Sequence, residues 1–161
     1  MGYSEIDIQR LFEAIDMSST SLNQEKTPAG GPFGAVIYKD NTCIAKGYNH
    51  VLSENDPTAH AEIYTIRQAC QKLKTFDLSG CTLYSSCEPC PMCLMACKWA
   101  NLDKVYFAAT RKDAADINFR DDDLYNMLKE GVFATPIPEC REKAIEAMQK
   151  WYKKFADNGN Y

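Results

Sequence analysis

Apolar residues recur at helical spacing near the start of the chain. Over about residues 4–22 they stand three and four positions apart, the spacing that lines one face of an α-helix. These residues are Ile6, Ile8, Leu11, Phe12 and Ile15. Gly30-Gly31-Pro32 then interrupts any regular pattern. The pattern therefore predicts an amphipathic helix followed by a break.

Two short apolar runs follow the break, at residues 33–38 and 43–48. The segment between them, Lys39-Asp40-Asn41-Thr42, is polar and typical of a tight turn. Two strand-like runs joined by so short a turn predict a β-hairpin.

Helix-like and strand-like runs alternate after the hairpin. Asp56-Pro57 begins a new element, and Thr58 is the predicted N-cap of a helix that ends near Leu73. Further runs predict a strand at 81–85, a helix at 91–99 and a strand at 104–108. A hairpin followed by strand–helix–strand crossovers predicts an α/β fold, with a mixed sheet and helices on both faces.

The last third of the chain is less regular. Residues 113–129 predict short helical pieces, and Pro136 and Pro138 mark a loop or an edge strand. A final helix is predicted over about residues 139–155. Because no repeat or linker interrupts the pattern, we expect one domain over residues 1–161.

Composition narrows the class of protein. Hydrophobic residues make up 45% and charged residues 25% of the 161 positions, as in a globular domain with a core. No apolar run is long enough for a membrane span and no secretory signal is present, so we expect no membrane partner. The net charge of −4 argues against a nucleic-acid partner. Eight cysteines without a secretory signal favour reduced thiols and a cytoplasmic protein.

Two short motifs carry candidate chemistry: His60-Ala61-Glu62, and Pro89-Cys90-Pro91-Met92-Cys93. Cys90 and Cys93 are three positions apart and share one face of a helix, whose positive N-terminus favours thiolates. With His60 they supply three ligands for one Zn²⁺, and a catalytic zinc keeps its fourth position for water. The combination resembles the signature of zinc-dependent nucleobase deaminases.

Other ligand sets have to be weighed. Cys87, Cys90, Cys93 and Cys97 could together close a structural zinc site. That set leaves His60 and Glu62 without a role, which favours the mixed set. Cys87 is then expected to end a strand as a core residue, and Cys97 to pack below the site. His50 lacks such neighbours and is expected to be a surface or hydrogen-bonded core residue.

Glu62 is the predicted catalytic residue. Deamination requires a proton for the ring nitrogen and another for the departing amine, and one carboxylate near the metal can carry both. A glutamate in a first helical turn also complements the helix dipole. Beside three metal ligands, the catalytic interpretation is favoured.

Three segments, at residues 30–37, 55–62 and 83–93, resemble the cytidine deaminase superfamily. Similar segments occur in tRNA adenosine deaminases and yeast-type cytosine deaminases, so they indicate the superfamily and leave the substrate open. The resemblance implies a three-layer α/β/α sandwich around a mixed five-stranded sheet.

Downstream, Asp113-Ala114-Ala115 and residues 119–125 are similar to the bacterial-type guanine deaminases. This resemblance implies that Asp121 binds the substrate. Because Arg120 stands where the family usually has an aspartate, Asp122 is an alternative. A carboxylate suits guanine, whose N1–H and 2-amino group are both donors. Three successive aspartates can equally be a solvated face.

The resemblance also implies roles for Asn49, Phe33 and Tyr161. Asn49 would read the purine ring, Phe33 would wall it, and Tyr161 would close the site; the alternatives are a turn asparagine, a core phenylalanine and a frayed end. In this family a tail corresponding to about residues 140–161 is exchanged between two subunits, which implies a homodimer.

The function implied is hydrolysis of guanine to xanthine and ammonia in purine catabolism or salvage. The alternatives are deamination of guanosine, cytosine or tRNA adenosine, or a non-catalytic zinc-binding module.

Overall fold

The computed structural model describes residues 2–20, 27–119, 121–130, 135 and 137–155, with only the backbone of Asp122 and Glu130. The chain divides into two compact units, Met1–Tyr125 and Asn126–Tyr161.

The first unit is built on a mixed sheet. Its described strands are β1 (Gly34–Lys39), β2 (Thr42–Tyr48), β3 (Cys81–Cys87) and β4 (Lys104–Ala109). They lie in the order β2-β1-β3-β4, in which β1 is antiparallel to β2 and β3, and β3 is parallel to β4. The predicted hairpin and crossovers are confirmed. Asp40 at the hairpin turn adopts a left-handed backbone with φ of 51°.

The expectation of five strands is wrong for the described residues, which form four. The region proposed as an edge strand contains Pro136, which lies outside the described residues, and Pro138, which opens the 3-10 helix η2 (Pro138–Cys140). Proline lacks the N–H that a ladder needs, so Pro138 starts a helical turn more readily than a strand.

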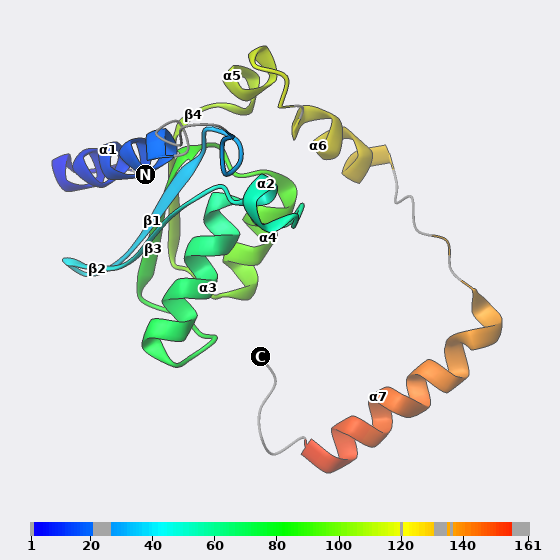
Figure 1. Cartoon of the computed structure of the whole chain (residues 1–161). Helices are drawn as coiled ribbons and strands as arrows, with labels where there is room; N and C mark the ends of the chain where they lie inside the picture. The colour runs from blue at the N-terminus through cyan, green and yellow to red at the C-terminus, as the bar shows by residue number, and fades with distance from the viewer. Residues whose placement is uncertain (1, 21–26, 120, 131–134, 136, 156–161) are drawn as a thin grey trace. The chain divides into compact units, whose positions relative to one another are not determined.

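Helices cover both faces of the sheet, as predicted (Figure 1). Helix α1 (Glu5–Ser19) packs on one face, mainly against β1 and β3. Helices α3 (Ala61–Leu73) and α4 (Pro91–Trp99) pack on the other face and against each other. The limits of α4 are those predicted from the sequence. The three-layer α/β/α arrangement is therefore confirmed.

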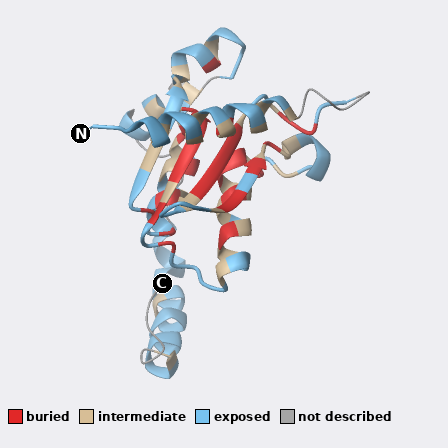
Figure 2. Ribbon diagram, turned by 90° about the vertical axis from the view of Figure 1, so that its left-hand side faces the viewer, coloured by how far each residue is buried: buried red, intermediate tan, exposed pale blue. Residues whose placement is uncertain are grey.

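Buried side chains point alternately to the two faces of the sheet along the strands. Ile37 and Leu83 point to the α3–α4 side, where they join the larger buried cluster. Val36 and Tyr84, one position away, point to the α1 side and pack with Ala14. Figure 2 shows the buried residues concentrated on the strands between the helical layers. Because side chains alternate with period two, neighbouring residues of β3 serve opposite faces of the sheet.

Three short helices connect or extend these elements. Helix α2 (Val51–Glu54), which follows β2, was not predicted. Helices α5 (Arg111–Asp116) and α6 (Asp121–Glu130) correspond to the predicted helical pieces at residues 113–129. Among the described residues, no helix is long and apolar enough to cross a membrane.

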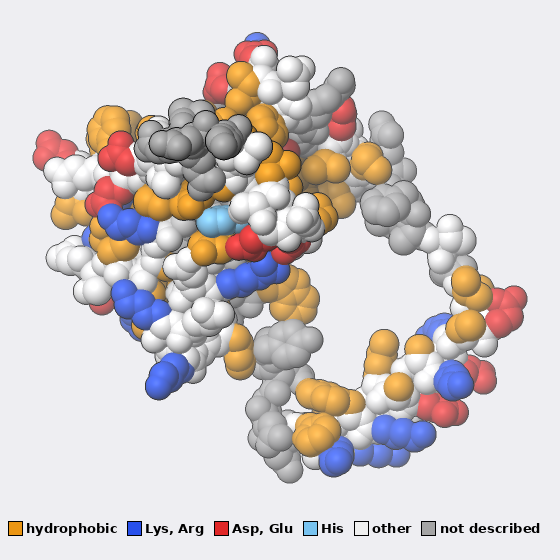
Figure 3. Space-filling view, in the orientation of Figure 1, with side chains coloured by type: hydrophobic (Ala, Val, Ile, Leu, Met, Phe, Trp, Pro, Cys, Tyr) orange, Lys and Arg blue, Asp and Glu red, His pale blue; other side chains and the backbone are white. Residues whose placement is uncertain are grey.

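The second unit contains the predicted final helix, α7 (Arg141–Phe155). No residue of α7 is buried. Met148, Trp151 and Tyr152 are exposed large apolar side chains. Figure 3 shows hydrophobic side chains along one side of this helix and charged side chains along the other. Helix α7 is thus amphipathic, with exposed apolar side chains on one side.

Candidate active site

Two helices begin at predicted metal ligands. His60 is the N-cap of α3 and Cys90 the N-cap of α4, and both have an extended backbone. Neither side chain caps its own helix, so both are available for another partner. Pro91 occupies the first turn of α4, where its missing N–H costs nothing. Cys93 follows on the same side of that helix.

Thr58 is not the N-cap of α3, contrary to the sequence prediction. Its backbone N–H and its hydroxyl both donate to Asp56 Oδ1, at 2.8 and 2.7 Å. That local turn uses the threonine side chain, and the helix begins later, at Ala61. The shift places His60 at the helix entrance, with its side chain directed toward the cysteines.

The three predicted ligands converge. His60 Nδ1 lies 3.7 Å from Cys90 Sγ and 3.6 Å from Cys93 Sγ. All three ligand atoms lie within 4.8 Å of one another. One imidazole and two thiols form a donor set that zinc prefers, and three ligands leave a position for water. The residues therefore fit a catalytic zinc ion.

The other cysteines lie outside this group. Cys87 is buried at the end of β3, and its thiol donates to the carbonyl of Thr110 at 3.5 Å. Cys97 is fully buried in the hydrophobic core. Among the described residues, the one cluster suited to a metal is His60, Cys90 and Cys93. The structure therefore supports the mixed set over the all-cysteine set.

Local hydrogen bonding favours a thiolate at Cys90. The Cys93 thiol and then His60 donate to its sulfur, and these contacts lower the pKa of Cys90 to about 4 despite burial. The same contact with Cys90 raises the pKa of His60. A negative sulfur is thus ready at the start of α4 to receive a divalent cation.

Glu62 lies in the first turn of α3 and is only 6% exposed. Burial raises the pKa of its carboxyl group, so the protonated form becomes accessible nearer neutral pH. A carboxyl group that can both hold and release a proton suits a general acid and base. The hydroxyl of Ser85 donates to Glu62 Oε1 at 3.1 Å.

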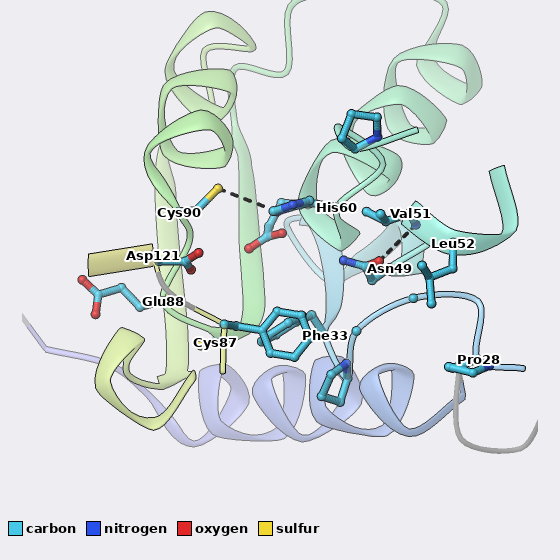
Figure 4. Close-up of a pocket in the computed structure, with 16 residues that line it drawn as sticks. Pro28, Phe33, Asn49, Val51, Leu52, His60, Cys87, Glu88, Cys90 and Asp121 are labelled. Carbon is cyan, nitrogen blue, oxygen red and sulfur yellow. Dashed lines mark hydrogen bonds between the residues drawn. The ribbon is translucent and has the colours of Figure 1, made fainter. Parts of the chain in front are cut away.

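A cavity of about 580 Å³ brings six of the predicted site residues together (Figure 4). Its lining includes Phe33, Asn49, His60, Glu62, Cys90 and Asp121. This volume lies in the range of small-molecule sites, about 300–1,000 Å³. The cavity therefore joins the metal group and the carboxylate of Glu62 to Phe33, Asn49 and Asp121, which come from three other parts of the first unit.

Asn49 holds one orientation at the cavity. Its side-chain oxygen accepts the backbone N–H of Val51 at 3.1 Å, and its backbone N–H donates to the carbonyl of Phe33 at 3.1 Å. Figure 4 shows the amide oxygen turned to Val51 and the amide nitrogen turned into the cavity. Asn49 can therefore present an N–H donor to a bound molecule.

Two aromatic rings wall the cavity. Phe33 meets Phe119 edge to face, with ring centroids 4.9 Å apart. Phe119 also lines the cavity. Phe119 is not among the site residues predicted from the sequence. The available signal was an aromatic residue beside an acidic run.

The acidic run contributes Asp121 to the cavity, as the first residue of α6. The side chain of Asp122 and the whole of Tyr161 lie outside the described residues.

A set of contacts ties the start of α6 to the cysteine loop. The Tyr125 hydroxyl donates to the carbonyl of Pro89 at 2.9 Å. The Arg111 guanidinium lies 4.5 Å from the centre of the Tyr125 ring, and the backbone N–H of Arg111 donates to the Glu88 carboxylate at 3.1 Å. These contacts keep Asp121 beside the metal group.

His50 is not a metal ligand. It is stacked between Tyr48 and Tyr64, with ring centroids 4.3 and 4.1 Å away. Its Nδ1 faces the hydroxyl of Ser53 at 3.3 Å, while its buried Nε2 has no hydrogen-bond partner among the described residues. His50 is neither an exposed surface residue nor a fully buried one, and of its two ring nitrogens only Nδ1 has a hydrogen-bond partner among the described residues.

A histidine and two cysteines at two helix starts, with a buried glutamate two residues after the histidine, define a zinc-dependent deaminase class. The chain belongs to the family described as the cytidine and deoxycytidylate deaminase zinc-binding region, whose model matches residues 9–109.

Within this family the chain is similar to guanine deaminases and tRNA-specific adenosine deaminases. The chain is 45% identical to a guanine deaminase of Bacillus subtilis over 154 residues, covering 94% of this chain and 96% of that protein. It is 36% identical to a tRNA-specific adenosine deaminase of Aquifex aeolicus over 130 residues, covering 79% and 83%. The X-ray structure of guanine deaminase from Bacillus subtilis superposes with a TM-score of 0.83 and 38% identity, covering 100% of this chain and 99% of that one.

Proposed function

We propose that the chain catalyses the zinc-dependent hydrolysis of guanine to xanthine and ammonia. The observation that carries the proposal is the meeting of Asn49 and Asp121 with the metal group and Glu62 at one cavity. Similarity to a guanine deaminase over nearly the whole chain supports guanine as the base. This reaction belongs to purine breakdown and salvage.

The mechanism divides between the metal group and Glu62. His60, Cys90 and Cys93 would hold a zinc ion, which would act as a Lewis acid and lower the pKa of a bound water to roughly 7. Glu62 accepts a proton from the water that attacks C2 of guanine and delivers it to N3 of the ring. Glu62 then assists the transfer of a proton to the 2-amino group, which leaves as ammonia. One guanine and one water thus give one xanthine and one ammonia.

The remaining residues orient the base. Asp121 accepts hydrogen bonds from N1–H and the 2-amino group, the two donors that flank C2. Asn49 donates its amide N–H to an acceptor of the purine ring. Phe33 and Phe119 supply apolar contact to the ring. Cytosine and adenine present a different pattern of donors and therefore fit this set less well.

The proposal is tested by ammonia release from guanine, guanosine, adenine and cytosine at equal concentration, with a tRNA anticodon stem-loop as a further substrate. We expect the highest kcat/KM with guanine. Faster turnover of cytosine or of the tRNA substrate would replace guanine as the substrate while retaining the zinc chemistry. A protein that binds zinc and releases ammonia from none of them would be a binding module.

Replacing Gly30 with alanine is expected to impair base recognition. A Cβ at this position would lie 1.9 Å from Asn49 Oδ1 and 2.8 Å from Asn49 Cγ, so the amide has to move. The loss of one oriented hydrogen bond to the base predicts about a tenfold rise in KM for guanine. Steady-state kinetics and zinc content check this, and an unchanged KM would contradict it. Gly2→Ala is the matched control, because a Cβ there meets no atom within 4 Å.

Asp121→Asn is expected to reduce selectivity for guanine. The amide keeps the size of the side chain but replaces one acceptor oxygen with a donor that faces the donors of the base. We expect kcat/KM for guanine to fall by about a hundredfold or more, because a site that hydrogen-bonds a substrate loses strongly when the pairing is broken. Asp123→Asn is the control. Equal losses in the two variants would contradict the assignment of Asp121.

We also propose a homodimer of single-domain subunits in which about residues 140–161 are exchanged, with Tyr161 closing the partner's site. The amphipathic character of α7, with its exposed apolar side chains, supports this proposal. Light scattering measures the mass. A chain truncated after Glu139 should be inactive alone and regain activity when mixed with full-length Glu62→Gln, which donates its tail. Failure to regain activity in mixed dimers would contradict the exchange.

The proposed setting is the cytoplasm, with a small purine base as the partner and no nucleic acid. All eight cysteines are free thiols in the structure, which fits a reducing compartment.

A further inference from the structure

Ser85 contacts the proposed proton carrier from the neighbouring layer. It lies in β3, is 1% exposed, and donates its hydroxyl to Glu62 Oε1 at 3.1 Å. It stands 23 positions from Glu62 in the sequence, and only the packing of α3 on the sheet brings the two together. It lies within the similar segment at residues 83–93 but outside the two motifs that carry the metal ligands and Glu62.

The sheet holds this hydroxyl in place. Ser85 is paired with Ala35 of β1 on one side and with Phe107 of β4 on the other. Its backbone is therefore fixed by two strand pairings near the middle of the sheet. A donor on such a rigid element can define the position of its acceptor closely.

The charged groups near Glu62 are the proposed metal ligands. Cys90, His60 and Cys93 all act on its carboxyl group, and all three are assigned to the metal. Ser85 contributes a neutral donor that needs no change when a metal binds. It is therefore suited to hold the carboxylate in one orientation during turnover.

We propose that Ser85 is a positioning residue, whose hydrogen bond to Oε1 orients Glu62 so that Oε2 carries the protons. This inference rests on the proposed deaminase function. A glutamate side chain has three rotatable bonds to its carboxylate, and proton transfer requires that group to lie within hydrogen-bond reach of water and the ring nitrogen. Holding one oxygen removes unproductive orientations before the substrate arrives.

The next residue of the strand is a matched control. Ser86 is also buried, at 8% exposure, but its side chain serves the opposite face of the sheet. Its Oγ accepts the backbone N–H of Gly34 at 3.0 Å. Ser86→Ala therefore removes a buried hydroxyl and one hydrogen bond from the same strand without touching Glu62.

The kinetic test uses the zinc-loaded protein and whichever base the wild type turns over fastest, so that it does not depend on guanine being the substrate. For Ser85→Ala we expect kcat to fall by about tenfold or more, the value of a hydrogen bond to a charged group, with KM unchanged within about twofold. Ser85→Thr keeps the hydroxyl and should restore most of kcat. Ser86→Ala should keep kcat, and all variants should retain zinc.

A second test needs no turnover. Thermal unfolding of the zinc-loaded protein is compared for Ser85→Ala, Glu62→Ala and the double variant. If the hydrogen bond forms, the shifts in Tm are not additive, because either change alone already removes it. Ser86→Ala combined with Glu62→Ala should be additive.

Several results would overturn the proposal. They are an unchanged kcat in Ser85→Ala, a loss no larger than that of Ser86→Ala, a Ser85→Thr variant as slow as Ser85→Ala, or additive shifts in Tm. If Ser85→Ala fails to fold, Ser85→Cys takes its place, since a thiol is a weak donor of nearly the same shape. If the wild-type protein does not turn over guanine but deaminates another base, guanine is rejected as the substrate. The role of Ser85 is then tested with that other base.

Discussion

Glu62→Gln is expected to abolish measurable ammonia release while the protein keeps one zinc per chain. An amide can neither take a proton from water nor deliver one to the ring, and general acid–base catalysis contributes about 10²–10⁴-fold. Because one carboxylate serves several proton transfers here, we expect a loss at or above the upper end of that range. Coupled ammonia detection gives kcat, and elemental analysis gives the zinc content.

The same substitution should leave the fold intact. The glutamine oxygen can still accept the Ser85 hydrogen bond, and a neutral side chain removes the cost of a buried charge. We therefore expect a Tm at or above that of the wild type. Glu13→Gln is the control, since Glu13 pairs with Lys46 and Tyr38 away from the cavity. A Glu62→Gln enzyme with more than about a tenth of the wild-type kcat would be incompatible with the proposed proton carrier.

Cys93→Ala is expected to lose both zinc and activity. Changes to groups that merely support metal ligands weaken metal binding by about 10–100-fold, so loss of a ligand should exceed about a hundredfold. Competition with a chelator measures the affinity, and ammonia release measures the consequence. His60→Ala should behave in the same way, because the histidine belongs to the ligand group.

Cys97→Ala separates the mixed ligand set from the all-cysteine set. Cys97 lies on the same helix as Cys93 and is equally buried, but it packs in the core outside the metal group. We expect this variant to keep its zinc and to lose some stability from the smaller side chain. Zinc loss in Cys97→Ala together with retention in His60→Ala would reverse the assignment.

The elements that the sequence predicts well have strong local signals. The limits of α4 follow from a proline at its start and an apolar, glycine-free run behind it. Helix α2 has four residues, too few to display a periodic pattern. The start of α3 was misplaced because Thr58 has two uses, as a cap or as part of a turn with Asp56, and only the three-dimensional contacts decide between them.

Some residues of the site can be predicted from short motifs and others cannot. His60, Glu62, Cys90 and Cys93 stand in short motifs whose spacing reports their chemistry. The structure brings the three ligand residues into one group, and His60, Glu62 and Cys90 line the cavity. Ser85 carries no such signal, because its importance comes from strand pairing and from the packing of α3. Sequence periodicity describes which face a residue occupies but not which distant side chain it meets.

Phe119 is a second site residue whose role could not be predicted from the sequence. It stands beside the acidic run in the sequence, yet in the structure it lines the cavity and meets Phe33, far away along the chain, edge to face. A lone aromatic residue in an irregular segment is as compatible with surface packing as with a binding site.

The central claim is tested most directly by incubating the zinc-loaded protein with guanine in ¹⁸O-labelled water and analysing the products by mass spectrometry. The proposed mechanism predicts xanthine that carries one ¹⁸O atom, with one ammonia released for each guanine consumed. Recovery of unchanged guanine from a protein that holds one zinc per chain, while another base in the same assay is deaminated, would contradict it.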